Sequence, residues 1–137
     1  MSTGSLEDRI AIRELRETYA DAVVRADPVD WAKVWTKDGH WTLMGTAVEG
    51  RDAIVAMWTQ AMRGHDAVSF HCIPSATMID GDCATGRCQT QEIMRTKDGT
   101  TRVIGGLYED EMIRQENGWR YSKRVFRVVA EYKPTEV

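Results

Sequence analysis

His71 is the histidine whose surroundings suggest chemistry. It stands in a stretch where Ser69, His71 and Ile73 would share one face of a β-strand. A neutral imidazole, with an ordinary pKa of about 6.5, can take a proton from carbon near neutral pH, and a carboxylate partner would fix its tautomer. We expect His71 to lie inside the protein, either as a general base or as a core histidine hydrogen-bonded to backbone or water.

Arg124 is the second residue with a chemical signature. It shares a strand face with Phe126 and Val128, and a guanidinium among apolar side chains needs an anionic or dipolar partner. Such a cation could stabilise charge on a leaving group or an enolate, or it could form a salt bridge at a subunit interface. The opposite face of this strand is also mixed, so alternation does not decide which face is concave.

Asp27 directly precedes Pro28, and this pair is typical of a helix start, with aspartate as the N-cap and proline at the first helical position. Its two carboxylate oxygens could nevertheless serve a helix N–H and an imidazole N–H together.

Aromatic and methionine side chains could line a pocket for a small apolar molecule. Each could equally be ordinary core, although Tyr19 would also place a hydroxyl on the inward stripe of a helix. The candidates for substrate binding are Tyr19, Trp41, Trp58, Met94, Tyr108 and Met112.

The composition indicates one globular domain over residues 1–137. The net charge of −3 argues against nucleic acid as a partner. We expect no membrane partner, because no apolar run could span a bilayer and the N-terminus lacks signal-peptide features. Three cysteines without a CxxC spacing favour reduced thiols in a cytoplasmic protein.

We also expect neither a metal nor a cofactor. The three histidines show no HExxH or paired-ligand spacing, and His71 and Cys72 would point to opposite faces of a strand. The sequence contains no GxSxG, GxGxxG or GxxxxGK[ST] motif.

Hydrophobic periodicity predicts three helices at 5–26, 28–35 and 53–62, with one short strand at 40–44. Four long strands follow, at 67–79, 84–95, 102–114 and 119–132, separated by glycine-containing turns. Helices segregated from an antiparallel sheet define an α+β fold. Three N-terminal helices packed on a curved, mostly antiparallel sheet would form a cone-shaped α+β barrel.

This layout and several local strings resemble the nuclear transport factor 2-like superfamily in its SnoaL-like branch. The resemblance covers nearly the whole chain and is specific for the fold, but the superfamily has many functions. The strings are IREL (12–15), YADA (19–22), DW (30–31), VEGRDAI (48–54), FH (70–71), DCATG (82–86), GLYED (106–110) and NGWRYSKR (117–124).

Within the superfamily, the chain is most similar to scytalone dehydratase and hexachlorocyclohexane dehydrochlorinase, which are cofactor-free lyases. The resemblance implies that His71 and Asp27 form the catalytic dyad and that Arg124 is the active-site arginine. The second histidine of scytalone dehydratase has no counterpart, since Met94 lies near its place. A small-molecule substrate and a homo-oligomer, either a trimer or a dimer, are implied as well.

The leading hypothesis is a cofactor-independent lyase that eliminates water or halide from a small apolar cyclic or aromatic substrate. One alternative is an isomerase or cyclase of the ketosteroid-isomerase or polyketide-cyclase kind. Its base would be a carboxylate, with Glu92, Glu109, Asp110 and Glu111 as candidates. Another alternative is a non-catalytic ligand-binding or assembly module, whose pocket would lack paired titratable groups or would be filled by side chains.

Overall fold

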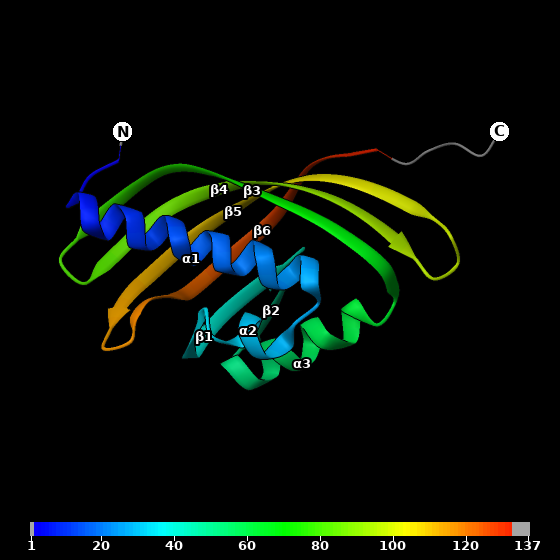
Figure 1. The fold of residues 1–137 in the computed structure, drawn as a ribbon, viewed down its shortest axis with the longest axis horizontal. Coiled ribbons are helices and arrows are strands. Elements are labelled where there is room, and N and C mark those ends of the chain that lie inside the picture. The colour runs from blue at the N-terminus through cyan, green and yellow to red at the C-terminus, as the bar shows by residue number, and fades with distance from the viewer. Residues whose placement is uncertain (1, 133–137) are drawn as a thin grey trace.

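The computed structural model describes residues 2–132 and confirms the α+β class. Its single sheet has six strands in the order β2-β1-β6-β5-β4-β3, and it curves around the helices (Figure 1). All strand pairs are antiparallel except β1 with β6, which are parallel. The elements are α1 (Leu6–Arg25), α2 (Pro28–Ala32), β1 (Trp35–Leu43), β2 (Thr46–Glu49), α3 (Arg51–Met62), β3 (His65–Asp80), β4 (Cys83–Thr96), β5 (Thr101–Gln115) and β6 (Gly118–Tyr132).

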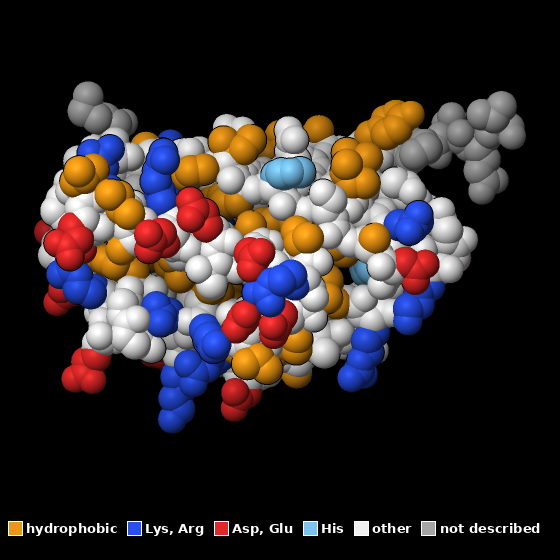
Figure 2. Space-filling model, in the orientation of Figure 1, with side chains coloured by type: hydrophobic (Ala, Val, Ile, Leu, Met, Phe, Trp, Pro, Cys, Tyr) orange, Lys and Arg blue, Asp and Glu red, His pale blue; other side chains and the backbone are white. Residues whose placement is uncertain are grey.

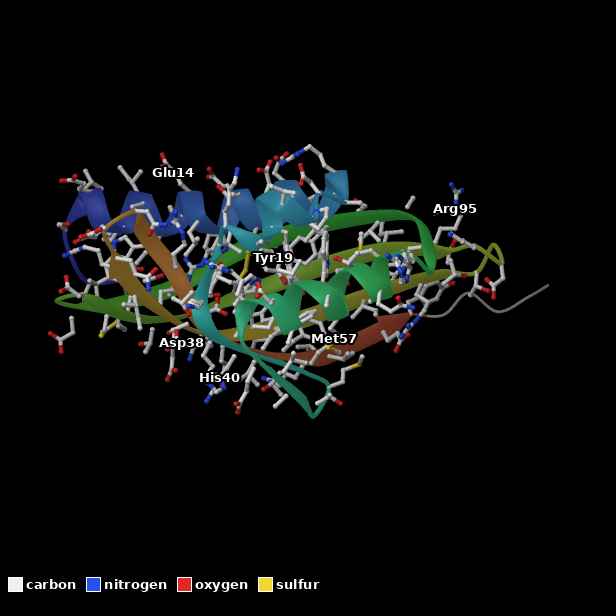
Figure 3. The ribbon with its side chains drawn as sticks, turned by 90° about the horizontal axis from the view of Figure 1, so that it is seen from below. Glu14, Tyr19, Asp38, His40, Met57 and Arg95 are labelled. Atoms are coloured by element: carbon white, nitrogen blue, oxygen red, sulfur yellow. A yellow bond between two sulfur atoms is a disulfide. The ribbon has the colours of Figure 1, made fainter. Side chains whose placement is uncertain are left out.

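The first helix begins and ends close to the predicted residues. The Ser5 hydroxyl accepts a hydrogen bond from the Asp8 backbone N–H, and Ala26 ends the helix in the left-handed conformation with a φ of 51°. The apolar stripe that includes Ile12 and Tyr19 is buried against the sheet. Figure 3 shows Tyr19 between the helix and the sheet.

The second helix is shorter than predicted. It ends at Ala32, and the strand that was expected to begin at residue 40 begins at Trp35. The cause is a distant partner, because the backbone carbonyl of Val34 accepts a hydrogen bond of 2.8 Å from the N–H of Tyr121 in β6. Strand β2 was not predicted; it follows a turn in which Met44 and Gly45 both have positive φ.

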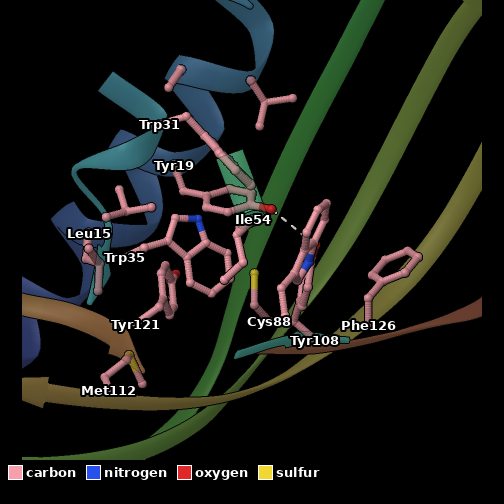
Figure 4. Packing of buried hydrophobic residues seen from close by; sticks show 14 of the residues in the cluster. Leu15, Tyr19, Trp31, Trp35, Ile54, Cys88, Tyr108, Met112, Tyr121 and Phe126 are labelled. Atoms are coloured by element: carbon pink, nitrogen blue, oxygen red, sulfur yellow. Dashed lines mark hydrogen bonds between the residues drawn. The ribbon is translucent and has the colours of Figure 1, made fainter. Parts of the chain in front are cut away.

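The four long strands form the predicted meander, and each predicted turn joins two of them. Their side chains alternate, so that residues such as Phe70 and Tyr108 are buried beneath the helices while Arg87 and Glu109 are exposed on the opposite face. The core between helices and sheet is rich in aromatic rings (Figure 4). Trp31 stacks on Trp58 with their ring centroids 4.5 Å apart.

The expectation of three reduced thiols is wrong for two of them. Cys72 of β3 and Cys88 of β4 form a disulfide, visible in Figure 3, whereas Cys83 is an exposed free thiol. The sheet register explains the pairing: Cys88 lies opposite Pro74, so its side chain lies close to that of Cys72. The two cysteines are 16 residues apart in the sequence, and this spacing alone does not predict a disulfide.

The surface that carries the helices has mixed charge. Figure 2 shows basic and acidic side chains interspersed over this face. One such group joins Arg25 to Asp21, Asp27 and Asp30 through ion pairs of 2.9 to 3.0 Å. None of the helices within residues 2–132 has the length and apolar character needed to span a membrane.

Candidate functional site

His71 lies on the exposed face of the sheet, which corrects the expectation that it would be inside. It pairs with Gln91 of β4, and both side chains are exposed. The neighbouring residue, Phe70, points inward instead and is 6% exposed. Because adjacent residues of a strand face opposite sides, the inward position belongs to the phenylalanine.

Asp27 acts as the N-cap of α2. One of its carboxylate oxygens accepts hydrogen bonds from the backbone N–H groups of Val29 and Asp30, at 3.0 and 3.1 Å. The other oxygen binds the guanidinium of Arg25 at 3.0 Å. Within residues 2–132 no hydrogen bond joins Asp27 to His71, so the structure does not form the predicted dyad.

Arg124 is fully buried, and its predicted need for an anionic partner is met by Asp110. The arginine Nε lies 2.7 Å from one carboxylate oxygen of Asp110, and its Nη2 lies 3.1 Å from the other. The two residues face one another across β5 and β6. The guanidinium also packs over the rings of Tyr19, Tyr108 and Tyr121, with 3.6 Å from its Cζ to the Tyr108 centroid. This ion pair forms within one chain.

A short chain of hydrogen bonds connects three of the predicted pocket residues. Trp41 donates from its indole N–H to the hydroxyl of Tyr108 at 3.1 Å, and that hydroxyl lies 3.1 Å from the hydroxyl of Tyr19. Burial raises the pKa of Tyr108 to about 12 and raises that of Tyr19 as well. Both phenols are therefore neutral at neutral pH and can donate a hydrogen bond.

Glu92 is the carboxylate that faces this interior. It lies on β4 between Phe70 of β3 and Ile104 of β5, which are its direct partners in the sheet. Burial raises the pKa of Glu92 to about 7, against a smaller lowering by Arg102. Arg102 is held by Glu131 at 2.7 to 2.8 Å, so it does not neutralise Glu92. A carboxylate with this pKa suits a general base at neutral pH.

The charge of Glu92 also affects the pKa of the two phenols. The charge of Glu92 contributes to the raised pKa of both Tyr19 and Tyr108, beyond the larger effect of burial. Glu92 lies opposite Ile104, four residues before Tyr108 along β5, and all three side chains are on the face of the sheet that the helices cover. Together, Glu92 and the two phenols provide a base and one free phenol O–H, because the other phenol proton lies in the hydrogen bond between the two hydroxyls. We call Glu92, Tyr19 and Tyr108 the carboxylate–phenol group.

The other carboxylates considered from the sequence have different positions. Glu109 and Glu111 are exposed on the opposite face of the sheet, and Asp110 is bound to Arg124. The alternation of side chains along β4 indicates that Glu92 points inward, because it shares a strand face with the buried Cys88 and the partly buried Met94.

The remaining predicted pocket residues divide between site and core. Met94 lies two residues from Glu92 on the same face and is partly buried. Trp58 stacks on Trp31, and Met112 is 1% exposed. Figure 4 shows Met112 on the Leu15 side of the core, away from Phe126. Among the described residues, no group of three or more histidine, cysteine, aspartate or glutamate side chains is placed to hold a metal ion.

Comparison with known proteins identifies the family to which this chain belongs. The family model described as "SnoaL-like domain" matches residues 4–125. The uncharacterized protein Rv2910c of Mycobacterium tuberculosis is 25% identical over 130 residues, which cover 91% of this chain and 88% of that protein.

Solved structures agree with the family match. A proposed aromatic ring hydroxylase from Novosphingobium aromaticivorans superposes with a TM-score of 0.89 at 25% identity, over 96% of both chains. A proposed scytalone dehydratase from the same organism has a TM-score of 0.83 at 18% identity, over 96% of this chain and 91% of that chain. The structure of LinA gives 0.84 at 18% identity, over 96% and 92%. The last two likenesses concern the fold alone.

Proposed function

Because the chain belongs to the SnoaL-like domain family, within the nuclear transport factor 2-like superfamily, we propose that it is an acid–base enzyme acting on a small, largely apolar carbonyl compound. Glu92 is the general base in this proposal. The observation that carries it is the inward carboxylate of Glu92, with a pKa of about 7, on the same face of the sheet as Tyr108, whose hydroxyl lies 3.1 Å from that of Tyr19.

The proposed reaction begins with removal of a proton from the carbon next to the carbonyl group. Glu92 takes this proton, and the electron pair of the broken C–H bond moves to the carbonyl oxygen as an enolate. A phenol hydroxyl donates a hydrogen bond to that oxygen, where the negative charge develops. Trp41 donates to Tyr108 and never accepts, so one phenol proton of the pair remains free for the substrate.

The fate of the enolate decides the reaction class. Return of the proton from Glu92 to a different carbon gives isomerisation. Expulsion of a hydroxide or halide from the β-carbon gives elimination, which is the chemistry that the names dehydratase and dehydrochlorinase describe in the neighbours. Of these two reactions, a carboxylate base with phenol donors favours isomerisation.

We also propose that the protein forms a homo-oligomer, which size-exclusion chromatography with light scattering would test.

The test is solvent exchange on a panel of small cyclic enones and β-hydroxyketones in D2O, followed by NMR. We expect turnover to rise with pH around an apparent pKa near 7 and Glu92→Gln to lower it by about 10²- to 10⁴-fold. Deuterium at a new carbon without loss of a group identifies isomerisation, and release of water or halide identifies elimination.

Two matched variants complete the test. Glu109→Gln removes an exposed carboxylate on the opposite face and should leave turnover unchanged. His71→Ala should also leave it unchanged, since that side chain is exposed. If His71→Ala abolished turnover while Glu92→Gln retained it, the base would be the histidine and this proposal would be wrong.

A second candidate is a non-catalytic module, and the filled interior favours it. The space between helices and sheet holds Trp31, Trp35, Trp41 and Trp58 in mutual ring contact. This candidate predicts no exchange at any carbon of the panel and no difference between the wild-type protein and Glu92→Gln.

A further inference from the structure

Arg16 of α1 is a buried cation with only neutral partners. Only 3% of the Arg16 surface is exposed to solvent. Its Nη1 donates to the Thr77 hydroxyl at 3.1 Å, and its Nη2 donates to the backbone carbonyl of Arg87 at 3.4 Å. Its Nε is buried and has no hydrogen-bond partner among residues 2–132. The Nε of this guanidinium is therefore a buried donor without an acceptor in the described part of the chain.

No carboxylate within the described residues forms an ion pair with Arg16, although the charge of Asp110 opposes the lowering of its pKa by burial. The fully buried carboxylate of Asp110 has both oxygens bound to Arg124. Glu17 follows Arg16 in the sequence but is exposed and forms no ion pair with it. Burial lowers the pKa of Arg16, as expected for a charge removed from water. An uncompensated buried charge is costly, so a bound anion would stabilise the folded protein.

A cleft of about 220 Å³ has Arg16 among its lining residues. It lies between α1 and β3. Arg13, one turn before Arg16, is an exposed cation without a carboxylate partner in the described structure. Two cations, Arg13 and Arg16, and one anion, Glu17, therefore line the cleft, and the other lining residues are apolar. Its lining residues are Arg13, Arg16, Glu17, Ala20, Cys72 and Pro74.

We propose that this cleft, which is separate from the carboxylate–phenol group, binds a short-chain aliphatic carboxylate. The carboxylate oxygens accept hydrogen bonds from Arg16 and Arg13, because guanidinium and carboxylate groups match in geometry and charge. The alkyl chain packs on Ala20 and Pro74. Glu17 at the cleft disfavours a second negative charge, so the site selects monoanions.

The first test measures thermal unfolding of the full chain with acetate, butyrate and neutral butyramide at constant ionic strength. We expect a saturable rise in the melting temperature of about 3–6 °C with butyrate, a smaller rise with acetate, and none with butyramide. A rise that is equal for butyrate and butyramide, or no saturable rise with either acid, overturns the proposal.

The second test uses charge variants on the exposed side of α1, which avoid removing the buried arginine. Arg13→Gln should weaken butyrate binding by about 10-fold, and Glu17→Gln should tighten it several-fold. The gain with Glu17→Gln cannot result from misfolding. Arg9→Gln and Glu14→Gln make the same charge changes on this helix outside the cleft and should leave the affinity unchanged. Equal shifts in the cleft variants and their controls would show only a general effect of charge.

Discussion

Glu92 links the proposed chemistry to stability. Its pKa is about 7 in the folded protein against an ordinary value of 4.5, so the folded state binds the proton more tightly than the unfolded state. The free energy of unfolding should therefore fall as the pH rises from about 4.5 to about 7 and stay low above it. At 1.36 kcal/mol per pKa unit, the fall is at most about 3 kcal/mol.

We expect Glu92→Gln to abolish this fall, because glutamine is neutral at every pH. Urea unfolding at pH 5 and pH 8 measures the effect: the variant should gain stability relative to the wild-type protein only at pH 8. Glu109→Gln provides the exposed control. Parallel pH profiles of Glu92→Gln and wild type would show that the carboxylate is not desolvated.

The sequence of β3 does not determine which face of the strand points into the core. Val68 and Phe70 alternate with Ser69 and His71, but Ile73 continues the face of His71, so both faces carry apolar residues. Only packing against α1 decides between them. The requirement of Arg124 for an anion was predictable from its apolar neighbours, whereas its partner Asp110 depends on the register of β5 and β6.

At the scale of elements, α2 owes its start to Asp27. Asp27→Ala removes the acceptor of two backbone N–H groups and should lower the free energy of unfolding by about 1 kcal/mol. Turnover at saturating substrate should not change, because Asp27 makes no contact with Glu92 or the phenols. Asp27→Asn preserves the cap, so a loss of turnover in that variant without loss of stability would assign Asp27 a catalytic role.

Strand β5 requires glycine at position 106. A Cβ there would overlap the ring of Phe126 and would lie 2.8 Å from the Thr90 hydroxyl oxygen. Gly106→Ala should therefore destabilise the protein by about 1–3 kcal/mol through overpacking. Gly105→Ala is the matched control, because its Cβ would meet nothing closer than the Ala130 carbonyl at 3.7 Å. Equal denaturation midpoints for the two variants would contradict this packing argument.

Elements that depend on local signals were predictable, and elements that depend on remote pairing were not. The glycine turns and the stripe of α1 are local features, and the structure has both. The early end of α2 follows from a backbone hydrogen bond to Tyr121, and the extent of β1 follows from its pairing with β6. The local helix and strand propensities of these residues do not predict such long-range contacts.

For the molecule as a whole, the buried pair of Arg124 and Asp110 joins β5 to β6 beneath α1. Arg124→Met leaves the Asp110 carboxylate buried without a partner and should destabilise the protein by about 3–5 kcal/mol. Replacing both, as Arg124→Met with Asp110→Leu, should recover most of that loss. Chemical denaturation of the wild type, both single variants and the double variant measures the coupling, and additive losses would contradict it.

The place of β6 in the sheet also constrains the order of events during synthesis. The last strand of the chain lies between β1 and β5, and Trp35 of β1 pairs with Tyr121 of β6. The amino-terminal third of the chain leaves the ribosome long before the strand on which it must close. Its tryptophan-rich surface therefore remains incomplete until β6 has been synthesised, and closure of the sheet follows the appearance of that strand. We therefore expect chains that have not yet formed β6 to expose the facing edges of β1 and β5.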